Sequence, residues 1–158
     1  MFETLFRDRA NITLASVPDG AEALALARIL GQAPKDGLAA VFVARDAGRA
    51  QGVIEALSYF APHVEALSLP AWDCLPYDRV SPNPAISARR LLVLGQLARG
   101  IPTGSGQKVL VTTVNAALQR LPERAWVAAQ TFSMAPGNRI DLTKIAAWLE
   151  LNGFSRTP

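Results

Sequence analysis

The feature that most constrains the fold is residues 38–44, a run of seven consecutive apolar residues. Such a run is typical of a β-strand that is buried on both faces of a parallel sheet. Asp46 follows the run and is placed to cap a helix. The apolar residues after it recur at spacings of three and four, which puts them on one helix face: Ala50, Val53, Ile54, Leu57 and Phe60. We therefore expect a strand followed by a helix that packs against the sheet.

The same alternation of strand and helix recurs along most of the chain. Strands are predicted at residues 11–17, 64–69 and 109–113, and helices at residues 21–30, 86–97 and 114–121. Alternation at this spacing predicts βαβ units with right-handed crossovers. The expected fold is α/β, with a mostly parallel sheet and helices on both faces.

Residues 129–158 break this pattern. Residues 131–134 predict a short strand, and Asp141 is expected to cap a helix that ends at Asn152-Gly153. A strand and one helix cannot bury a core by themselves. We expect residues 1–128 to form one α/β domain, and residues 129–158 to begin a small α+β domain that the chain does not complete.

The charge and composition exclude several classes of protein. The net charge is +3 and no basic run is longer than Arg89-Arg90, which predicts at most weak, non-specific binding to DNA. The apolar runs are too short to cross a membrane, and the first residues lack the apolar core of a secretory signal. The single cysteine, Cys74, fits a reducing compartment. We expect a cytoplasmic protein.

Residues 16–23 lie where an α/β protein would bind a phosphate, between the first predicted strand and its helix. A working phosphate loop needs a Lys for the β- and γ-phosphates and a Ser or Thr for Mg²⁺. When this loop, which contains Gly20, is superposed on that motif, Glu22 falls where the Lys belongs and Ala23 falls where the hydroxyl residue belongs. Pro18 also removes a backbone N–H donor. We expect a degenerate loop that binds no nucleotide, and so no cofactor in this chain.

Other catalytic and metal sites are not expected either. The only histidine, His63, has no convergent partner groups in the sequence. Cys74 lies among packing residues, and no cysteine or histidine cluster has the spacing of a metal site. The sequence therefore predicts neither catalytic residues nor metal ligands.

The most distinctive stretch is residues 69–82. Pro70, Pro76 and Pro82 each fix the backbone and push the preceding residue towards an extended geometry. These prolines predict a stiff loop in which Trp72, Leu75 and Tyr77 are largely buried against the sheet edge.

This stretch and the segments after it resemble the N-terminal region of the bacterial transcription-repair coupling factor family. Residues 72–82 match W-[ED]-x-L-P-Y-[DE]-x-x-S-P, and an R-L-x-x-L core follows at residues 90–94. Residues 109–120 match V-L-[IV]-x-x-V-N-x-[AL]-[ML]-Q-R, and residues 137–154 match the family's G-x-x-[LI]…G-[YF] segment. The motif residues that we interpret as structural are Trp72, Leu75, Pro76, Tyr77, Asp78, Ser81, Pro82, Arg90, Asn115 and Arg120.

The resemblance, which covers residues 11–158, implies a fold and a role. The family's N-terminal region is similar to that of the excinuclease B protein, the damage-recognition component of the bacterial excinuclease, with a helicase-like α/β domain whose nucleotide loop has decayed. The small domain after it contacts the excinuclease A protein. The full-length proteins use ATP and Mg²⁺ elsewhere in the chain to move on DNA, displace stalled RNA polymerase and recruit excision repair.

Two alternatives stay open at this point. An active ATP-dependent helicase similar to the excinuclease B protein would need a Lys-Ser or Lys-Thr pair after the first strand. A freestanding α/β protein that binds a small ligand would be expected to end near residue 125.

Overall fold

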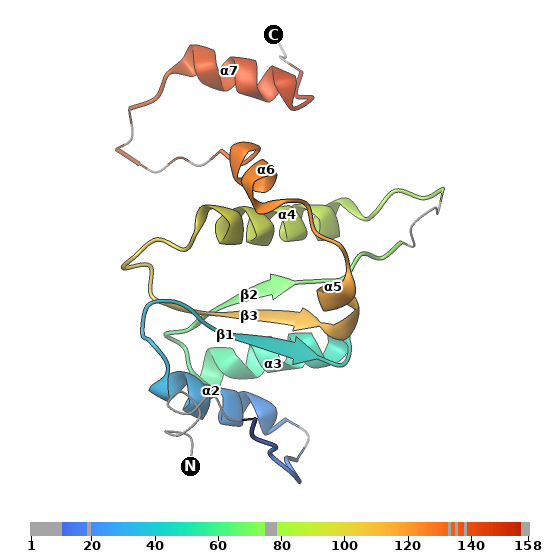
Figure 1. The fold of residues 1–158 in the computed structure, drawn as a ribbon, viewed down its shortest axis with the longest axis vertical. Helices are drawn as coiled ribbons and strands as arrows, with labels where there is room; N and C mark the ends of the chain where they lie inside the picture. The colour runs from blue at the N-terminus through green and yellow to red at the C-terminus, as the bar shows by residue number, and fades with distance from the viewer. Residues whose placement is uncertain are drawn as a thin grey trace.

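The computed structural model describes residues 11–18, 20–74, 79–132, 134, 136–137 and 139–155. These residues form a three-stranded sheet with helices on both faces, which confirms the predicted α/β fold (Figure 1). The elements in chain order are α2 (Glu22–Gln32), β1 (Gly37–Ala44), α3 (Ala47–Phe60), β2 (Glu65–Leu69), α4 (Pro84–Arg99), β3 (Gln107–Thr113), α5 (Val114–Leu118), α6 (Arg124–Ala129) and α7 (Leu142–Leu151).

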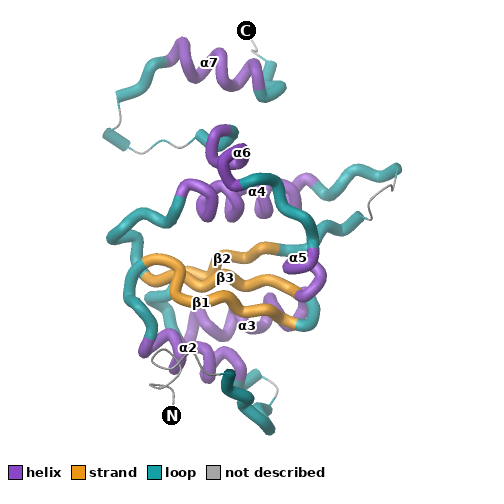
Figure 2. The backbone as a smooth tube through the Cα atoms, viewed as in Figure 1, coloured by secondary structure: helices purple, strands orange, loops and turns teal. Residues whose placement is uncertain are grey.

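The sheet has the order β1-β3-β2, and both strand pairs are parallel. The chain passes from β1 to β2 through α3 and returns from β2 to β3 through α4. The helices α3 and α4 lie on opposite faces of the sheet, with α2 outside α3 and α6 outside α4 (Figures 1 and 2). Right-handed crossovers require this arrangement, because the chain moves across the sheet in opposite directions in the two connections.

The larger core lies between the sheet and α3. Leu57 of α3 and Val109 and Val111 of β3 are almost completely buried there, and Leu30 of α2 closes the cluster from outside. A smaller core lies between the sheet and α4, and it is formed by Leu67, Leu69, Val93 and Leu110.

The prediction that β1 is buried on both faces is wrong for one face. Leu38, Val41 and Val43 are 42%, 55% and 47% exposed, whereas Ala44 is buried. The physical reason is that α4 packs over β2 and Leu110 of β3 and does not extend over β1.

Two predicted strands are absent from the described residues. Residues 11–17 form no strand, because β propensity alone does not fix a strand without a partner edge, and none of the described strands pairs with them. Residues 131, 132 and 134 form none either. Thr131 donates instead from its hydroxyl to the Val127 carbonyl at 2.6 Å, at the end of the unpredicted helix α6.

Thr131 also lies against α4 at Gly95. A Cβ atom built on Gly95 would lie 3.0 Å from Cγ2 of Thr131, so glycine permits this close approach.

The predicted helix caps are confirmed. Asp46 accepts from the Arg49 N–H at 2.8 Å and caps α3, and Asp141 accepts from the Thr143 N–H at 3.1 Å and caps α7. Gly153, at φ 84°, follows α7 as expected. Some predicted ends are displaced: α2 runs two residues past residue 30, to Gln32, and α5 ends at Leu118 instead of residue 121. Within the described ranges, no helix has the length and apolarity needed to cross a membrane.

Candidate functional site

The candidate site is a crevice of about 520 Å³ at the carboxyl ends of the three strands. In open parallel sheets, ligands bind outside these strand ends. The segments that follow the three strands line the crevice, with Arg45 and Asp46 from the loop after β1, Trp72 and Asp73 from the loop after β2, and Asn115 from the start of α5, which follows β3 directly. Basic and acidic side chains both line it, so its charge alone selects no ligand.

The degenerate loop lies next to this crevice, beside a second cavity of about 370 Å³. Gly20 adopts φ 86°, and its N–H donates to the Glu22 carboxylate at 3.0 Å. Arg49 of α3 forms an ion pair with the same carboxylate. Ala23 is buried, at 1% exposed. The place of the phosphate-binding Lys is thus taken by an acid that already binds an arginine.

Charge and hydrogen bonding both keep Glu22 ionised. Partial burial raises the pKa of its carboxyl, but hydrogen bonds from its own N–H, from Arg49 and from Gly20 outweigh this and lower the pKa below its ordinary value. The carboxylate therefore stays negative near neutral pH, where it would repel a phosphate at short range.

The proline-rich stretch is held to α4 by Arg90. Arg90 is 1% exposed, and its guanidinium lies 4.5 Å above the centre of the Trp72 ring and donates from Nη1 to the Pro70 carbonyl. Its Nε has no hydrogen-bond partner among the described atoms, and burial lowers the pKa of the group. The backbone N–H of Trp72 donates to Oε1 of Gln119 at 3.2 Å. We call Arg90, Trp72, Pro70 and Gln119 the arginine clamp.

The arginine clamp joins three of the stretches that carried the family resemblance, namely residues 72–82, residues 90–94 and residues 109–120. Trp72 is half-buried instead of largely buried, because Arg90 covers one ring face while the indole also lines the crevice. A structural role for Trp72 and Arg90 fits these contacts.

The remaining motif residues are more dispersed. Asn115 is exposed and lines the crevice, Ser81 and Arg120 are exposed, and Pro82 is half-buried. The predicted positions Leu75, Pro76, Tyr77 and Asp78 lie outside the described residues.

Several residues of the site were not predicted. Asp73 accepts from the Asn83 N–H at 3.2 Å, and Asn83 in turn caps α4. An Asn directly before a Pro is a recognised helix start, so Asn83-Pro84 could have been found in the sequence. Arg49 contacts Glu22, which lies 27 residues away in the sequence, and Gln119 contacts Trp72, which lies 47 residues away. No local sequence pattern predicts such contacts.

The described residues contain no group of three His, Cys, Asp or Glu side chains that could hold a metal ion. His63 is exposed and Cys74 is half-buried.

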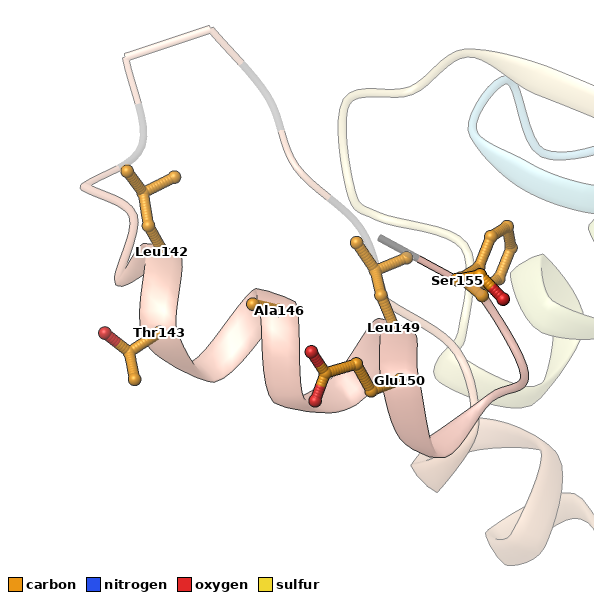
Figure 3. A pocket seen from close by; sticks show the side chains of 7 residues that line it. Leu142, Thr143, Ala146, Leu149, Glu150 and Ser155 are labelled. Carbon is orange, nitrogen blue, oxygen red and sulfur yellow. The ribbon is translucent and has the colours of Figure 1, made fainter. Parts of the chain in front are cut away.

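A third hollow, of about 470 Å³, lies along one face of α7 (Figure 3). Leu142, Ala146, Leu149 and Phe154 supply its apolar surface. Phe132 contacts α7 on Trp148, with ring centroids 5.7 Å apart. No residue of α7 is fully buried.

No known family model matches the chain. It is 28% identical over 98 residues to a transcription-repair-coupling factor of Rickettsia bellii, which covers 62% of the chain and 8% of that protein. The corresponding protein of Rickettsia prowazekii has the same identity and coverage. The protein of Escherichia coli K12 is 29% identical over 114 residues, which covers 72% of the chain and 9% of that protein.

The chain thus spans less than a tenth of the length of these relatives. They carry the name of the family that its ordered motifs resemble. Over 62–72% of its length, this chain is similar to the transcription-repair-coupling factors.

Proposed function

We propose that this chain is an N-terminal, non-catalytic module of a transcription-repair coupling factor. Such a protein displaces RNA polymerase that has stalled at DNA damage and recruits the nucleotide excision repair machinery. The observation that carries the proposal is the similarity to five curated proteins of that name. The arginine clamp supports it, because the motifs of the resemblance meet there in space.

The non-catalytic part of the proposal rests on the degenerate loop. A phosphate loop combines a helix N-terminus, converging backbone N–H groups and a Lys charge. Here the Gly20 N–H donates to Glu22, and Glu22 pairs with Arg49. Ala23 offers no ligand for Mg²⁺. The positive end of α2 remains, worth about 0.3–1 kcal/mol, which is too little to hold a triphosphate.

Titration of the chain with Mg-ATP in a calorimeter, together with a phosphate-release assay, tests this part. We expect no binding tighter than about 1 mM, equivalent to about −4 kcal/mol, and no hydrolysis. A matched Glu22→Lys, Ala23→Ser double variant restores only the Lys and the hydroxyl residue of the motif, and shows how much these two replacements contribute. Micromolar affinity in the unaltered chain that is lost in Glu22→Ala would reject the degenerate-loop proposal and revive the active helicase alternative.

The partner-binding part of the proposal concerns the excinuclease A protein. We propose that the module presents a small second domain to this protein, and that residues 129–158 begin that domain. RNA polymerase, DNA, ATP and Mg²⁺ would then be bound by other parts of the full-length protein.

A pull-down or titration with the purified excinuclease A protein tests this part. Residues 1–158 should bind weakly or not at all, whereas a chain extended through the second domain should bind. Equal affinity of the two chains would place the contact within residues 1–158. The relatives that were found favour neither the helicase alternative nor a freestanding ligand-binding protein.

A further inference from the structure

The two layers of helices differ in charge. Residues 79–122, which include α4, contain six Lys and Arg residues and no Asp or Glu. Arg90 and Lys108 are buried, and the other four are exposed: Arg79, Arg89, Arg99 and Arg120. On the opposite layer, Arg49 of α3 pairs with Glu22 of α2. The α4 layer therefore presents positive charge that no acid of the same stretch balances.

The same layer has an apolar hollow of about 220 Å³ between α4 and α6, the helix that lies outside α4 (Figure 1). Apart from Arg124, its lining is apolar and consists of Leu94, Leu97, Ala98, Leu121, Pro122 and Val127. Pockets for small ligands and cofactors usually measure about 300–1,000 Å³. The hollow is smaller, so its size suits one apolar side chain of a protein partner.

The apolar surface continues along α4 beyond the hollow. Leu91 lies three residues before Leu94 and seven before Ala98, which places the three side chains on one side of the helix. Leu91 is 59% exposed, and Leu121, which lines the hollow, is 49% exposed. Exposed leucines next to a hollow favour a protein partner over a nucleic acid, because contacts to phosphates use charged and polar groups.

Two exposed arginines lie at the carboxyl end of α4. Arg124 donates from Nε to the Ala98 carbonyl at 2.9 Å, and this bond holds its guanidinium beside the hollow. Its two terminal nitrogens make no hydrogen bond to the described residues, so they can bind a carboxylate at two points. Arg99 directly follows Ala98 and forms no ion pair with any acid that the structure describes.

We propose that the α4–α6 surface, which consists of this hollow with Leu91, Arg99 and Arg124, docks an acidic amphipathic segment of another protein. One apolar side chain of that segment fills the hollow, and its carboxylates bind Arg99 and Arg124. Charge complementarity selects this class of partner, because the layer offers arginines and exposed leucines together. The surface is separate from residues 129–158, so the inference goes beyond the proposed function and does not depend on it.

Fluorescence anisotropy with two labelled peptides tests the proposal. The first peptide, of roughly 15–20 residues so that it can form a helix, carries Leu on one face and Glu on the flanks of that face. In the second peptide, every Glu is replaced by Lys. The acidic peptide should bind at least about tenfold more tightly than the basic one, and should lose affinity when the salt concentration rises from about 0.1 M to 1 M.

Substitutions at exposed positions locate the binding surface. Arg99→Glu should weaken binding of the acidic peptide at least about tenfold without changing the melting temperature, because it reverses a charge that makes no described ion pair. Leu91→Ser should weaken binding of the acidic peptide at all salt concentrations, because it removes apolar contact area. Arg28→Glu, the same change at an exposed position on α2, is the matched control and should leave the affinity unaltered.

The natural full-length protein should bind the acidic peptide as tightly as residues 1–158 do. Loss of binding in the full-length protein would show that its own chain covers the surface, and would overturn the inference. Equal affinity for the two peptides, or equal effects of Arg99→Glu and Arg28→Glu, would overturn it as well. A short DNA duplex that displaces the acidic peptide would make nucleic acid the partner instead. Failure of an extended chain to bind the excinuclease A protein would reject only the partner in the proposed function.

Discussion

The two faces of the sheet are stabilised in different ways. On the α3 face, eleven buried apolar residues form one cluster that extends from α2 across α3 to the strands. On the α4 face the buried apolar cluster has four members, and polar contacts lie around it. There Thr112 donates to the Leu69 carbonyl at 2.8 Å, Lys108 pairs with Glu65, and the arginine clamp holds the proline-rich stretch.

The α3 face is therefore held mainly by apolar packing, whereas the α4 face depends on a smaller apolar cluster together with polar contacts. Apolar burial is non-directional and needs only area, which α2 and α3 supply together. The α4 face has less apolar area to bury and depends more on specific hydrogen bonds, which a single substitution can remove. We therefore expect the α3 face to set the global stability, and the α4 face to set the position of the loops around the crevice.

The largest expected effect is on the α3 face. Leu57 is 1% exposed at the centre of the larger cluster, and Leu57→Ala should lower the free energy of unfolding by about 2–5 kcal/mol. Urea denaturation followed by circular dichroism measures this loss. Leu118→Ala, at an 80% exposed leucine, is the control and should change stability by no more than about 0.5 kcal/mol.

A smaller effect is expected from the arginine clamp. Arg90→Ala removes a charged hydrogen bond to the Pro70 carbonyl and should cost about 1.5–3 kcal/mol. Its loss should also shift the fluorescence of Trp72. The exposed neighbour Arg89 provides the matched control, since Arg89→Ala leaves the clamp intact. If Arg90→Ala lowered the free energy of unfolding more than Leu57→Ala does, the α4 face and not the α3 face would set the global stability.

The smallest expected effect concerns Asp36, which directly precedes β1 at the amino ends of the strands. Its carboxylate accepts from the Gly104 N–H at 2.7 Å and from the Gly106 N–H at 3.0 Å, and these bonds lower its pKa below the ordinary 3.8. A lowered pKa stabilises the fold above pH 3.8, and this contribution is lost as the pH falls through the lower folded-state pKa.

Melting temperatures measured between about pH 2 and pH 6 test this expectation. Asp36→Asn should lower the melting temperature slightly near neutral pH and make its decline below pH 4 less steep than in the unaltered protein. Identical pH profiles for the two proteins would show that Asp36 does not contribute to stability.

Local patterns predicted most of the fold. The apolar run at residues 38–44 and the helical spacing after Asp46 gave the first strand and helix of the sheet, and Asp141 gave the start of α7. These signals are local, because a strand run or a helix cap is decided by neighbouring residues. Residues 11–17 carried a similar strand signal but form no strand, since a strand also needs a partner edge.

The candidate site was harder to predict from the sequence. The substitution of Glu22 into the phosphate loop was visible, but its ion pair with Arg49 joins two helices across 27 residues. Trp72 and Arg90 were both identified by the family motif, yet their stacking depends on how α4 packs on the sheet. The exposure of Val41 and Val43 depends on where α4 lies, which no residue in β1 encodes.

The strand order has a consequence for the time at which the fold can form. β1 pairs with β3 from Gly37↔Gln107 onward, so each paired residue waits for a partner about 70 positions later in the chain. At a synthesis rate of about 5–20 residues per second, that delay is roughly 4–14 s. During this interval the apolar strand has left the ribosome without its only described partner. The growing chain therefore passes through a stage in which protection of β1 by a chaperone would have its greatest value.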